Sequence, residues 1–600
     1  MTVSDSTRQV VVIGGGHNGL VAALRLARAG CEVTVLEQGA EPGGCVWTER
    51  HPSGVLVERG AFEHGGILPV AEELGLTSDE LGDATLCYRE HPVAAGFVFG
   101  DGERRTFHTD LDRTVEGLGD DGESYRELVA LADTLFGMLD TFDTPPTPTQ
   151  VAAALAPLRG GDELFRTMLL PAEQVIDQAL RDPHTRAALA LQAAHAQVPA
   201  WAPGTGLFAL LLPASHAGPA VRPVGGSRAL TEALVAALRR AGGAVRTDAA
   251  VVALRTSSHT RRADLDRSST ARPEPIRTAK AGVFGGSPGA RVAVPAASVG
   301  FDWSNRGEVE LSDGSVVGAD AVVSSIGAPR TVALLSDPAP ALRASAAGLH
   351  SGHFNVSELT VTVVFDRAVD LGLPDPDAIW YAVADPGDVR RGFAEVLAGQ
   401  LPSSPWAMVG QVAQPDDVEG SAVWMSSIVP LRAADGAWNA AAERAAAQRV
   451  VDHVGEVLGV DLGVGVVDTI VSGPSTWERR IGGDGNPNHI DNTIDQLLGW
   501  RTPGHADMRT ELDWLFLAGA GQHPGGGLSG ASGSAAAGAV LTPRAAGRSL
   551  VDRWRDELVG LARGALAYRR MRRGSTAGGL GTSGGRGAAG ARGTRGGGAT

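Results

Sequence analysis

The stretch QVVVIGGGHNGLVAALRLARAGCEVTVLE, residues 9–37, decides the fold of this chain. It opens with a β-branched run at residues 9–13, which is typical of a buried strand. Three glycines follow at once, and residues 18–29 then repeat apolar side chains at helical spacing. Residues 32–36 form a second strand-like run that ends at Glu37. The stretch therefore predicts one parallel β-α-β unit, and with it an α/β fold.

The glycine loop and the acidic residue after the second strand together predict a dinucleotide site of the Rossmann type. Gly14 permits the tight turn, Gly16 lets the backbone approach a pyrophosphate, and Gly19 lets the helix pack closely on the strand. The helix that begins after Asn18 offers free N–H groups and a partial positive charge to the phosphates. Glu37 is placed to accept hydrogen bonds from ribose hydroxyls, which favours an adenosine without a 2′-phosphate. A glycine-rich turn without a ligand is disfavoured, because strand, loop, helix and acid all agree.

Two further segments identify the dinucleotide through a resemblance. GGCVWT, residues 43–48, resembles the G-G-x-x-x-[ST] element of the large FAD family that includes amine oxidases and phytoene desaturases. LFLAGAGQHPGGGLSGASGSAAAGAV, residues 515–540, resembles the closing FAD motif of that family. The resemblance implies FAD as the cofactor, and it assigns contacts with the flavin side of FAD to Gly43, Gly44, Thr48, Gly519, Gly521, Gly530 and Ala531. It also implies that the backbone of Val251 meets the adenine and that His17 shields the pyrophosphate.

The resemblance is closer to one branch of this family. GGGHNGLVAALRLARAG at residues 14–30 and RPVGGSRALTEALVAALRRAGG at residues 222–243 look like the phytoene dehydrogenase-like branch. That branch includes carotenoid desaturases, ketolases and isomerases, and residues 107–118 and 202–213 resemble its ketolase-like members. The resemblance implies hydride transfer between an apolar, isoprenoid or carotenoid substrate and the flavin, with no dedicated acid or base. No second dinucleotide fingerprint is found, so the terminal electron acceptor stays open.

The resemblance also implies a discontinuous domain organisation. Three segments build the FAD-binding domain, and two segments between them build an α+β substrate-binding domain. The FAD-binding segments are 1–95, 216–345 and 496–568, and the substrate-binding segments are 96–215 and 346–495. Residues 256–298 are rich in Ser, Thr, Arg, Pro and Gly without periodicity, and residues 574–600 are almost all Gly, Ala, Arg, Thr and Ser. Such compositions cannot bury a core, so we expect a disordered insertion and a disordered tail.

A few side chains are candidates for chemistry. His523 lies in the flavin-facing loop and is the catalytic candidate, although a histidine that only shapes the turn is the competing interpretation. Cys45 has no partner cysteine and is interpreted as a packed small residue. Leu207, Phe208, Leu210 and Leu211 are candidates for a tunnel or equally for ordinary core. The nucleophile-elbow pattern at residues 285–289 lies within the insertion and lacks a preceding strand, so it is disregarded.

Composition excludes several classes of function. The formal net charge of −16 disfavours nucleic acid as a partner. Three cysteines without a C-x-x-C pair disfavour both a disulfide framework and a dithiol centre, and no ligand spacing for a metal is present. No signal-peptide core or membrane-spanning stretch is recognised, so we expect a cytoplasmic protein. The arginines near residues 569–573 leave a peripheral membrane contact open.

Two alternatives to the polyene oxidoreductase remain. The first is a flavin oxidase that acts on an amine or another small polar substrate, for which an aromatic-lined pocket is expected. The chain has only four tyrosines, which disfavours that interpretation weakly. The second is a protein that uses this fold to bind apolar cargo without flavin chemistry, which Glu37 and the two glycine elements argue against.

Overall fold

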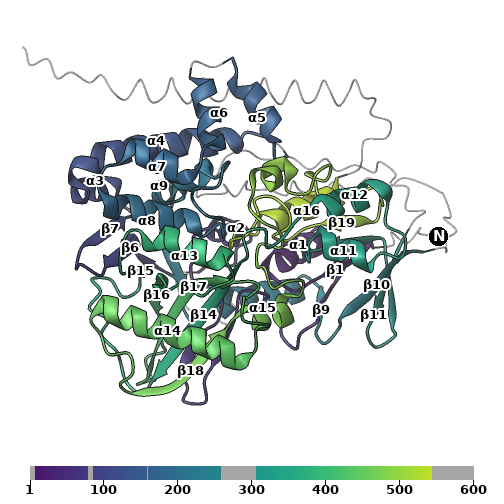
Figure 1. Ribbon diagram of the computed structural model, residues 1–600. Coiled ribbons are helices and arrows are strands. Elements are labelled where there is room, and N and C mark those ends of the chain that lie inside the picture. The colour runs from purple at the N-terminus through teal and green to yellow at the C-terminus, as the bar shows by residue number, and fades with distance from the viewer. Residues whose placement is uncertain (1–6, 79–85, 143, 158–159, 258–305, 543–600) are drawn as a thin grey trace, which may run out of the picture.

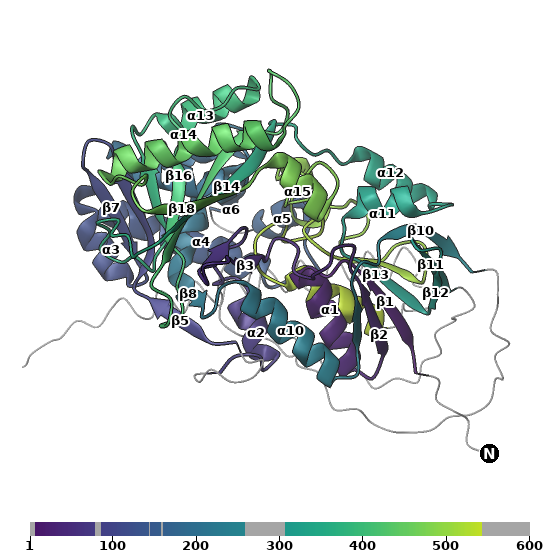
Figure 2. The ribbon, with the colours of Figure 1, turned by 90° about the horizontal axis from the view of Figure 1, so that it is seen from below.

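The computed structural model describes residues 7–78, 86–142, 144–157, 160–257 and 306–542. Most of the predicted insertion, the predicted tail, the elbow-like pattern, the C-terminal arginines and the first six residues lie outside these ranges. Within them the chain forms two sheet-centred parts that lie side by side (Figures 1 and 2). In the part of the chain that the structure describes, no helix is both long and apolar enough to cross a membrane.

The first part is built on a five-stranded parallel sheet whose strands come from distant segments. Its central strands β1 (Gln9–Ile13) and β2 (Glu32–Leu36) pair in register, as the glycine-loop stretch predicts. Three further strands complete the order β19-β13-β1-β2-β9: β19 (Leu515–Leu517), β13 (Ala321–Ser324) and β9 (Ala244–Arg246). The carboxyl ends of all five strands therefore meet at one edge, which is where ligands bind in open parallel sheets.

Helices and a small sheet cover the two faces of this sheet. On one face α1 (His17–Arg28) packs between α10 (Arg228–Arg240) and α16 (Ala531–Leu541), and their aliphatic side chains form one core with β1 and β2. The other face carries an antiparallel sheet of β10 (Val251–Thr256), β11 (Gly307–Leu311) and β12 (Val316–Ala319). Figure 2 shows these strands beside β1 and β2.

The strand-like composition of residues 244–254 predicts one continuous strand, and this prediction is wrong in its extent. The structure divides these residues between β9 of the parallel sheet and β10 of the small sheet. The chain turns at Asp248, whose φ is +51°, and the Asp248 N–H donates to the Gly39 carbonyl at 3.0 Å. The turn brings the start of β10 beside Glu37, because the Ala249 N–H donates to the Glu37 carbonyl at 2.9 Å.

The second part is built on a seven-stranded mixed sheet. The apolar runs at residues 359–365 and 422–429 predict two strands of this sheet. They belong to β14 (Val356–Phe365) and β17 (Ser421–Pro430), which pair antiparallel. The remaining strands, in the order β18-β14-β17-β16-β15-β6-β7, are β18 (Val466–Ser472), β16 (Ala407–Gln411), β15 (Trp380–Val383), β6 (Val93–Phe99) and β7 (Arg104–His108). Of the described pairings in this sheet, only β15 with β6 is parallel.

Helices cover both faces of the seven-stranded sheet. The helix α14 (Ala440–Leu458) packs on one face together with β14 and β17. A helical layer with its own large core lies against the other face and is drawn at the upper left of Figure 1. Its helices are α3 (Leu111–Gly117), α4 (Gly122–Leu139), α5 (Pro148–Leu155), α6 (Gly161–Leu169), α7 (Ala172–Ala179), α8 (Pro183–Ala194), α9 (Leu211–Ala214) and α13 (Asp388–Leu397).

Short elements connect the two parts and approach the site. They are the hairpin of β3 (Thr48–Arg50) and β4 (Leu56–Glu58), the pair of β5 (Tyr88–His91) and β8 (Ala220–Pro223), and the helices α2 (Leu68–Glu73), α11 (Ala328–Leu334), α12 (Pro340–Gly348) and α15 (Pro474–Ile481). The candidates for a tunnel or for core, Leu207, Phe208, Leu210 and Leu211, do not lie in these connecting elements. Leu207 and Leu210 are buried in the core of the helical layer, so the core interpretation holds for these two.

Candidate functional site

The glycine loop at the end of β1 has the geometry that its spacing predicts. Gly14 has a φ of +94°, which favours glycine, and its N–H donates to the Leu36 carbonyl at 2.9 Å. A Cβ on Gly19 would lie 2.1 Å from the Gly14 carbonyl oxygen, so only glycine lets α1 pack this closely. A Cβ on Gly16 would meet no atom within 4 Å. The loop is therefore closely packed at Gly14 and Gly19, whereas the space next to Gly16 is open.

Glu37 closes the loop from the end of β2. Its Oε2 accepts the Gly15 N–H and its Oε1 accepts the Gly39 N–H, each at 2.8 Å. The side chain is buried, with 8% exposed, and it lines a cavity at the carboxyl edge of the parallel sheet. A carboxylate has about four acceptor positions, so two remain for a ligand. Glu37 thus orders the loop and still presents oxygens to the cavity.

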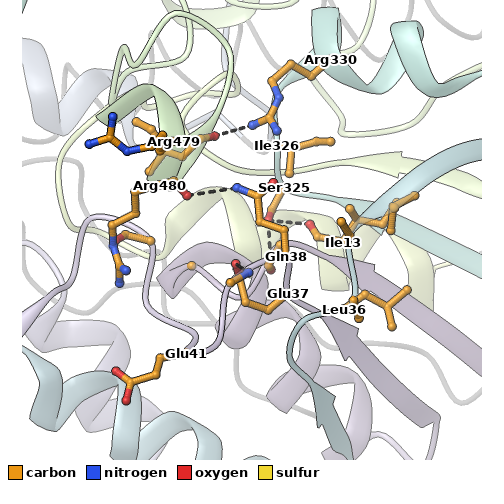
Figure 3. Close-up of a pocket in the computed structure, with 18 of the residues that line it drawn as sticks. Ile13, Leu36, Glu37, Gln38, Glu41, Ser325, Ile326, Arg330, Arg479 and Arg480 are labelled. Carbon is orange, nitrogen blue, oxygen red and sulfur yellow. Dashed lines mark hydrogen bonds between the residues drawn. The ribbon is translucent and has the colours of Figure 1, made fainter. Parts of the chain in front are cut away.

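This cavity at the carboxyl edge of the parallel sheet, here called the nucleotide cavity, has a volume of about 880 Å³. The glycine loop, Glu37 and the start of β10, including the predicted Val251, form one side of it. Three arginines from α11 and α15, namely Arg330, Arg479 and Arg480, form the opposite side (Figure 3). Arg480 also donates from Nε to the Gly44 carbonyl at 2.7 Å, and its guanidinium stacks on Trp47 at 3.9 Å from the ring centroid. A helix N-terminus and fixed positive charge therefore favour the binding of an anionic ligand in this cavity.

The second glycine pair lies against the first loop. The Gly43 N–H donates to the Gly15 carbonyl at 2.9 Å, and Gly44 lines both this cavity and a neighbouring one. Thr48, in contrast, lines neither cavity. Its hydroxyl donates to Glu58 Oε2 at 2.8 Å and accepts the Arg228 N–H at 2.9 Å. The structure thus brings the glycine pair to the site and gives Thr48 a place in the supporting β3–β4 hairpin.

The neighbouring cavity, here called the flavin-side cavity, has a volume of about 430 Å³. Gly16, Gly44, Ser325, Ile481 and His489 line both cavities, so the two are adjoining halves of one site. Most of the wall that lies beyond this junction is apolar and aromatic. It includes Phe62, Ile379, Tyr381, Trp406, Met408, Trp424, Ile428 and Trp477.

The C-terminal motif reaches this site through its loop. Gly519, Ala520, Gly527 and Leu528 line the flavin-side cavity, whereas Gly521, Gly530 and Ala531 do not. The Gly519 N–H donates to Ser532 Oγ at 3.1 Å, and the Gly533 N–H donates to Asn18 Oδ1 at 3.3 Å. The first bond ties the loop after β19 to the first turn of α16, and the second ties that turn to the first turn of α1. Both helix N-termini therefore lie at the same end of the site.

Three histidines line the flavin-side cavity, and the predicted His523 is not among them. They are His17, His195 and His489. His523 contributes to neither cavity wall and its Nδ1 is buried without a hydrogen-bond partner, so the structure does not place it as a catalytic residue. Burial lowers the pKa of His17 to about 4 and that of His489 to about 3. Both are neutral near pH 7.

His489 was not found from the sequence. It lies in an irregular segment after α15 with a φ of +64°, and no periodicity or motif marks it. Its Nδ1 is buried without a hydrogen-bond partner at the junction of the two cavities. An unpaired buried nitrogen at that position is available to a bound ligand. Cys45, which also lines the flavin-side cavity, is inert as a thiol because burial raises its pKa to about 12.

Metal chemistry has no counterpart among the described residues. In those ranges no group of three His, Cys, Asp or Glu side chains is arranged to hold a metal ion. The three cysteines are free thiols.

With this geometry in place, part of the site can be matched to a known protein family. Residues 19–281 match the family of flavin containing amine oxidoreductases. The match takes in most of α1, Glu37, the second glycine pair and the start of β10, and of these Glu37, Gly44 and Val251 line the nucleotide cavity. It covers fewer than half of the 600 residues.

Individual relatives of this flavin family match over short segments. A limonene dehydrogenase component of Castellaniella defragrans is 38% identical over 125 residues, which are 20% of this chain and 22% of that protein. Hydroxyneurosporene desaturase of Cereibacter sphaeroides is 33% identical over 149 residues, which are 23% of this chain and 28% of that protein. The chain thus aligns with about a quarter of the length of these curated relatives.

A solved structure matches over nearly the whole chain. An oxidoreductase from Methanosarcina mazei superposes with a TM-score of 0.54 at 14% identity, covering 89% of this chain and 99% of that one. This likeness shows the fold. Together the comparisons bear out the predicted fold, FAD as the cofactor and the class of flavin-dependent oxidoreductase.

The residues present fit FAD. Open space in front of Gly16, the α1 N-terminus and the buried carboxylate of Glu37 suit a pyrophosphate and a ribose. The unpaired Nδ1 of His489 and the loop at Gly519 stand where the nucleotide cavity passes into the flavin-side cavity. One dinucleotide can therefore extend from Glu37, past Gly16, to the aromatic wall.

Proposed function

We propose that this protein is an FAD-dependent oxidoreductase that removes hydride from an apolar substrate of the isoprenoid or carotenoid class. One observation carries the proposal: the flavin-side cavity, which begins at the dinucleotide loop, is walled mainly by aromatic and aliphatic side chains. Its volume of about 430 Å³ lies within the range of small-molecule sites.

The walls of the flavin-side cavity would bind and orient such a substrate. Phe62 and Trp424 are stacked with ring centroids 4.7 Å apart, and Tyr381 stacks on Phe97 at 4.6 Å. Rings fixed in this way present flat, rigid apolar surfaces to a chain of carbon atoms and exclude water from it. FAD, when bound, supplies the hydride acceptor. The contribution of these side chains is to hold one C–H bond in place.

The names of two relatives support an apolar substrate. One matching segment comes from a limonene dehydrogenase and another from a hydroxyneurosporene desaturase. Each match covers less than a quarter of this chain, so the two matches support the chemistry more than the exact substrate. Under this proposal, residues 1–95, 216–345 and 496–568 hold FAD, and residues 96–215 and 346–495 hold the substrate.

The proposal keeps most of the predicted cofactor contacts. Gly14, Gly16, His17, Asn18, Gly19, Glu37, Gly44 and Gly519 hold the dinucleotide, with Val251 at the adenosine end. Gly43 supports the loop through its N–H, which donates to the Gly15 carbonyl. Arg480 and His489 join this set on the basis of their positions in the cavity walls. Thr48, Gly521, Gly530 and Ala531 line neither cavity and leave the set of cofactor contacts, and His523 is no longer the catalytic candidate.

An amine substrate is the second candidate, favoured by two carboxyl groups in the flavin-side cavity. Glu63 and Glu358 both line this cavity, and a carboxylate there would pair with an ammonium group. The description of the matching family also names amine oxidoreductases. Against this candidate, burial is the largest influence on both groups and raises their pKa values, which weakens the negative charge that would pair with an ammonium group.

Anaerobic reduction of the bound flavin separates the two candidates. The purified protein is titrated without oxygen with an acyclic carotenoid precursor, a cyclic monoterpene and an aliphatic diamine, and the flavin absorbance is followed. Bleaching by the polyene or the terpene is expected. Bleaching by the diamine alone would establish the second candidate, and a colourless protein that does not take up FAD would contradict both.

A further inference from the structure

Buried polar atoms converge without hydrogen-bond partners behind one wall of the flavin-side cavity. They are Glu63 Oε1, His91 Nε2, and Nε and Nη2 of Arg222. Both His91 Nε2 and Arg222 Nε lie 3.8 Å from Glu63 Oε1. The three residues come from the β4–α2 connection, from β5 and from β8, and the pairing of β5 with β8 brings the last two together. We call them the Glu63 cluster.

The hydrogen bonds of His91 determine where a proton can reside in this cluster. His91 Nδ1 lies 2.9 Å from the Val93 carbonyl oxygen, which can only accept, so Nδ1 carries a hydrogen. In a neutral imidazole Nε2 is then a lone-pair acceptor, and it faces Glu63 Oε1. Two lone pairs that face each other at 3.8 Å repel, and a proton taken up by either atom relieves that repulsion. The cluster is therefore built to receive one proton.

Glu63 connects this proton site to the flavin-side cavity. It lines the cavity next to Phe62, and 36% of its side-chain surface is accessible there, while its Oε1 atom is buried. His91 and Arg222 lie deeper, with 3% and 8% of their side chains exposed, and neither lines the cavity. Arg222 is held in place by a hydrogen bond from Nη1 to the Gln411 carbonyl at 2.7 Å and by stacking on Phe62 at 3.7 Å. Within the cluster, only Glu63 can touch a substrate.

We propose that Glu63 is a catalytic base that takes the proton which the substrate loses on oxidation, with His91 and Arg222 as positioning residues. The inference rests on the proposed function. One substrate C–H bond gives up its hydrogen with both electrons to oxidised FAD. The adjoining C–H bond, or an N–H or O–H bond, breaks with its electron pair forming the new double bond. Its proton forms the O–H bond of Glu63, so two electrons and two hydrogens leave the substrate in total.

The surroundings tune Glu63 for this task. Burial raises its pKa to about 7, and the positive charge of Arg222 works in the opposite direction. A base with a pKa near the working pH is the most effective one. The groups that face Glu63 from the packed elements are His91 on β5, Arg222 on β8 and Tyr381 on β15, and the carboxylates of Glu58, Asp375 and Asp377 lie near Arg222.

The test follows anaerobic flavin reduction by whichever compound of the panel bleaches the wild type. The wild-type rate should rise with pH and level off above about 7, because the ionised form of Glu63 is required. Glu63→Gln keeps the shape of the side chain, so FAD content should stay the same while the rate falls by at least about 100-fold and the pH dependence disappears. Glu63→Asp should recover part of the rate. Glu72→Gln, which removes the same charge from the exposed side of α2, is the matched control and should stay within about twofold.

A second measurement needs no substrate. Infrared difference spectra of the FAD-loaded wild type against Glu63→Gln should contain a protonated-carboxyl band that disappears as pH rises through about 7. Replacing His91 by Gln should shift the midpoint of that titration, whereas a purely structural role for His91 would leave the midpoint unchanged.

Distinct outcomes overturn the inference and the proposed function. A Glu63→Gln protein that reduces its flavin at the wild-type rate with the wild-type pH profile overturns the inference. So does a flat wild-type profile between about pH 5.5 and 8.5, which remains decisive if the variants do not fold. If no compound reduces the wild-type flavin, the proposed function fails, and the infrared band still decides whether Glu63 exchanges a proton.

Discussion

The two cavities of the site adjoin at Gly16 but differ in the chemical groups that line them. The nucleotide cavity is formed by backbone loops, a helix N-terminus, Glu37 and four arginines. The flavin-side cavity is formed mainly by large aromatic and aliphatic side chains of the seven-stranded sheet and of α15. The nucleotide cavity suits a charged cofactor that stays bound. The flavin-side cavity suits the apolar surface of a substrate that is exchanged after each turnover.

The difference implies that binding of the cofactor and binding of the substrate can be separated by mutation. Backbone groups that bind phosphate cannot be removed by changing a side chain, so the nucleotide cavity can only be blocked. The flavin-side cavity can be reshaped one side chain at a time. Variants that affect one cavity and spare the other test the comparison directly.

The largest effect is expected from Gly16→Leu. Gly16 is the N-cap of α1 with a φ of −70° and a ψ of 168°, which any residue adopts, and its Cβ would point into open space. The variant should therefore fold and yet lose FAD, because leucine fills the place where the pyrophosphate approaches. We expect the dissociation constant for FAD to rise at least about 100-fold, measured by fluorescence titration of the flavin-free protein. Gly318→Leu on β12, also in open space, is the control and should keep its flavin. An unchanged affinity in Gly16→Leu would contradict the placement of FAD.

Much of the nucleotide cavity could be predicted from the sequence because its parts are local. Gly14, Gly16 and Gly19 act within one turn of the chain, and Glu37 lies at the end of the next strand. Their spacing reflects backbone geometry that a single β-α-β unit imposes. The strands at residues 9–13 and 32–36 were predicted for the same reason and pair as expected.

The flavin-side cavity could not be predicted because distant segments assemble it. Glu63, His91 and Arg222 lie on three separate elements, and only the pairing of β5 with β8 and the packing of Phe62 bring them together. His489 lies in an irregular loop. His523 was chosen from its place in a glycine-rich motif, but the loop directs Gly519 and Leu528 to the cavity instead. A motif gives the order of residues and not the direction of each side chain.

A smaller effect is expected from Met408→Ala in the flavin-side cavity. Met408 on β16 lines the flavin-side cavity and not the nucleotide cavity. Removing most of an apolar side chain from a substrate contact costs about 1–2 kcal/mol, which corresponds to roughly a tenfold rise in KM for the apolar substrate. The affinity for FAD should change by less than about threefold. Parallel measurement of KM and of the FAD dissociation constant checks this, and equal effects on both would mean that the cavities are not separable.

The smallest effect concerns His489, which both cavities share. Burial lowers the pKa of His489 to about 3, below the value of 6.5 that the unfolded chain has. As pH falls below about 6.5, the unfolded chain binds the proton first, so the folded protein loses stability. Gln at this position cannot take up a proton, and the variant should lose about 1 kcal/mol less than the wild type between pH 7 and pH 5.5. Chemical denaturation at the two pH values measures this, with the exposed His353→Gln as control. If His353→Gln gives the same gain, the effect does not come from the burial of His489 at the junction of the two cavities. Among the residues that the structure describes, His489 is the one titratable residue that lines both cavities, so this result would contradict its assigned place there.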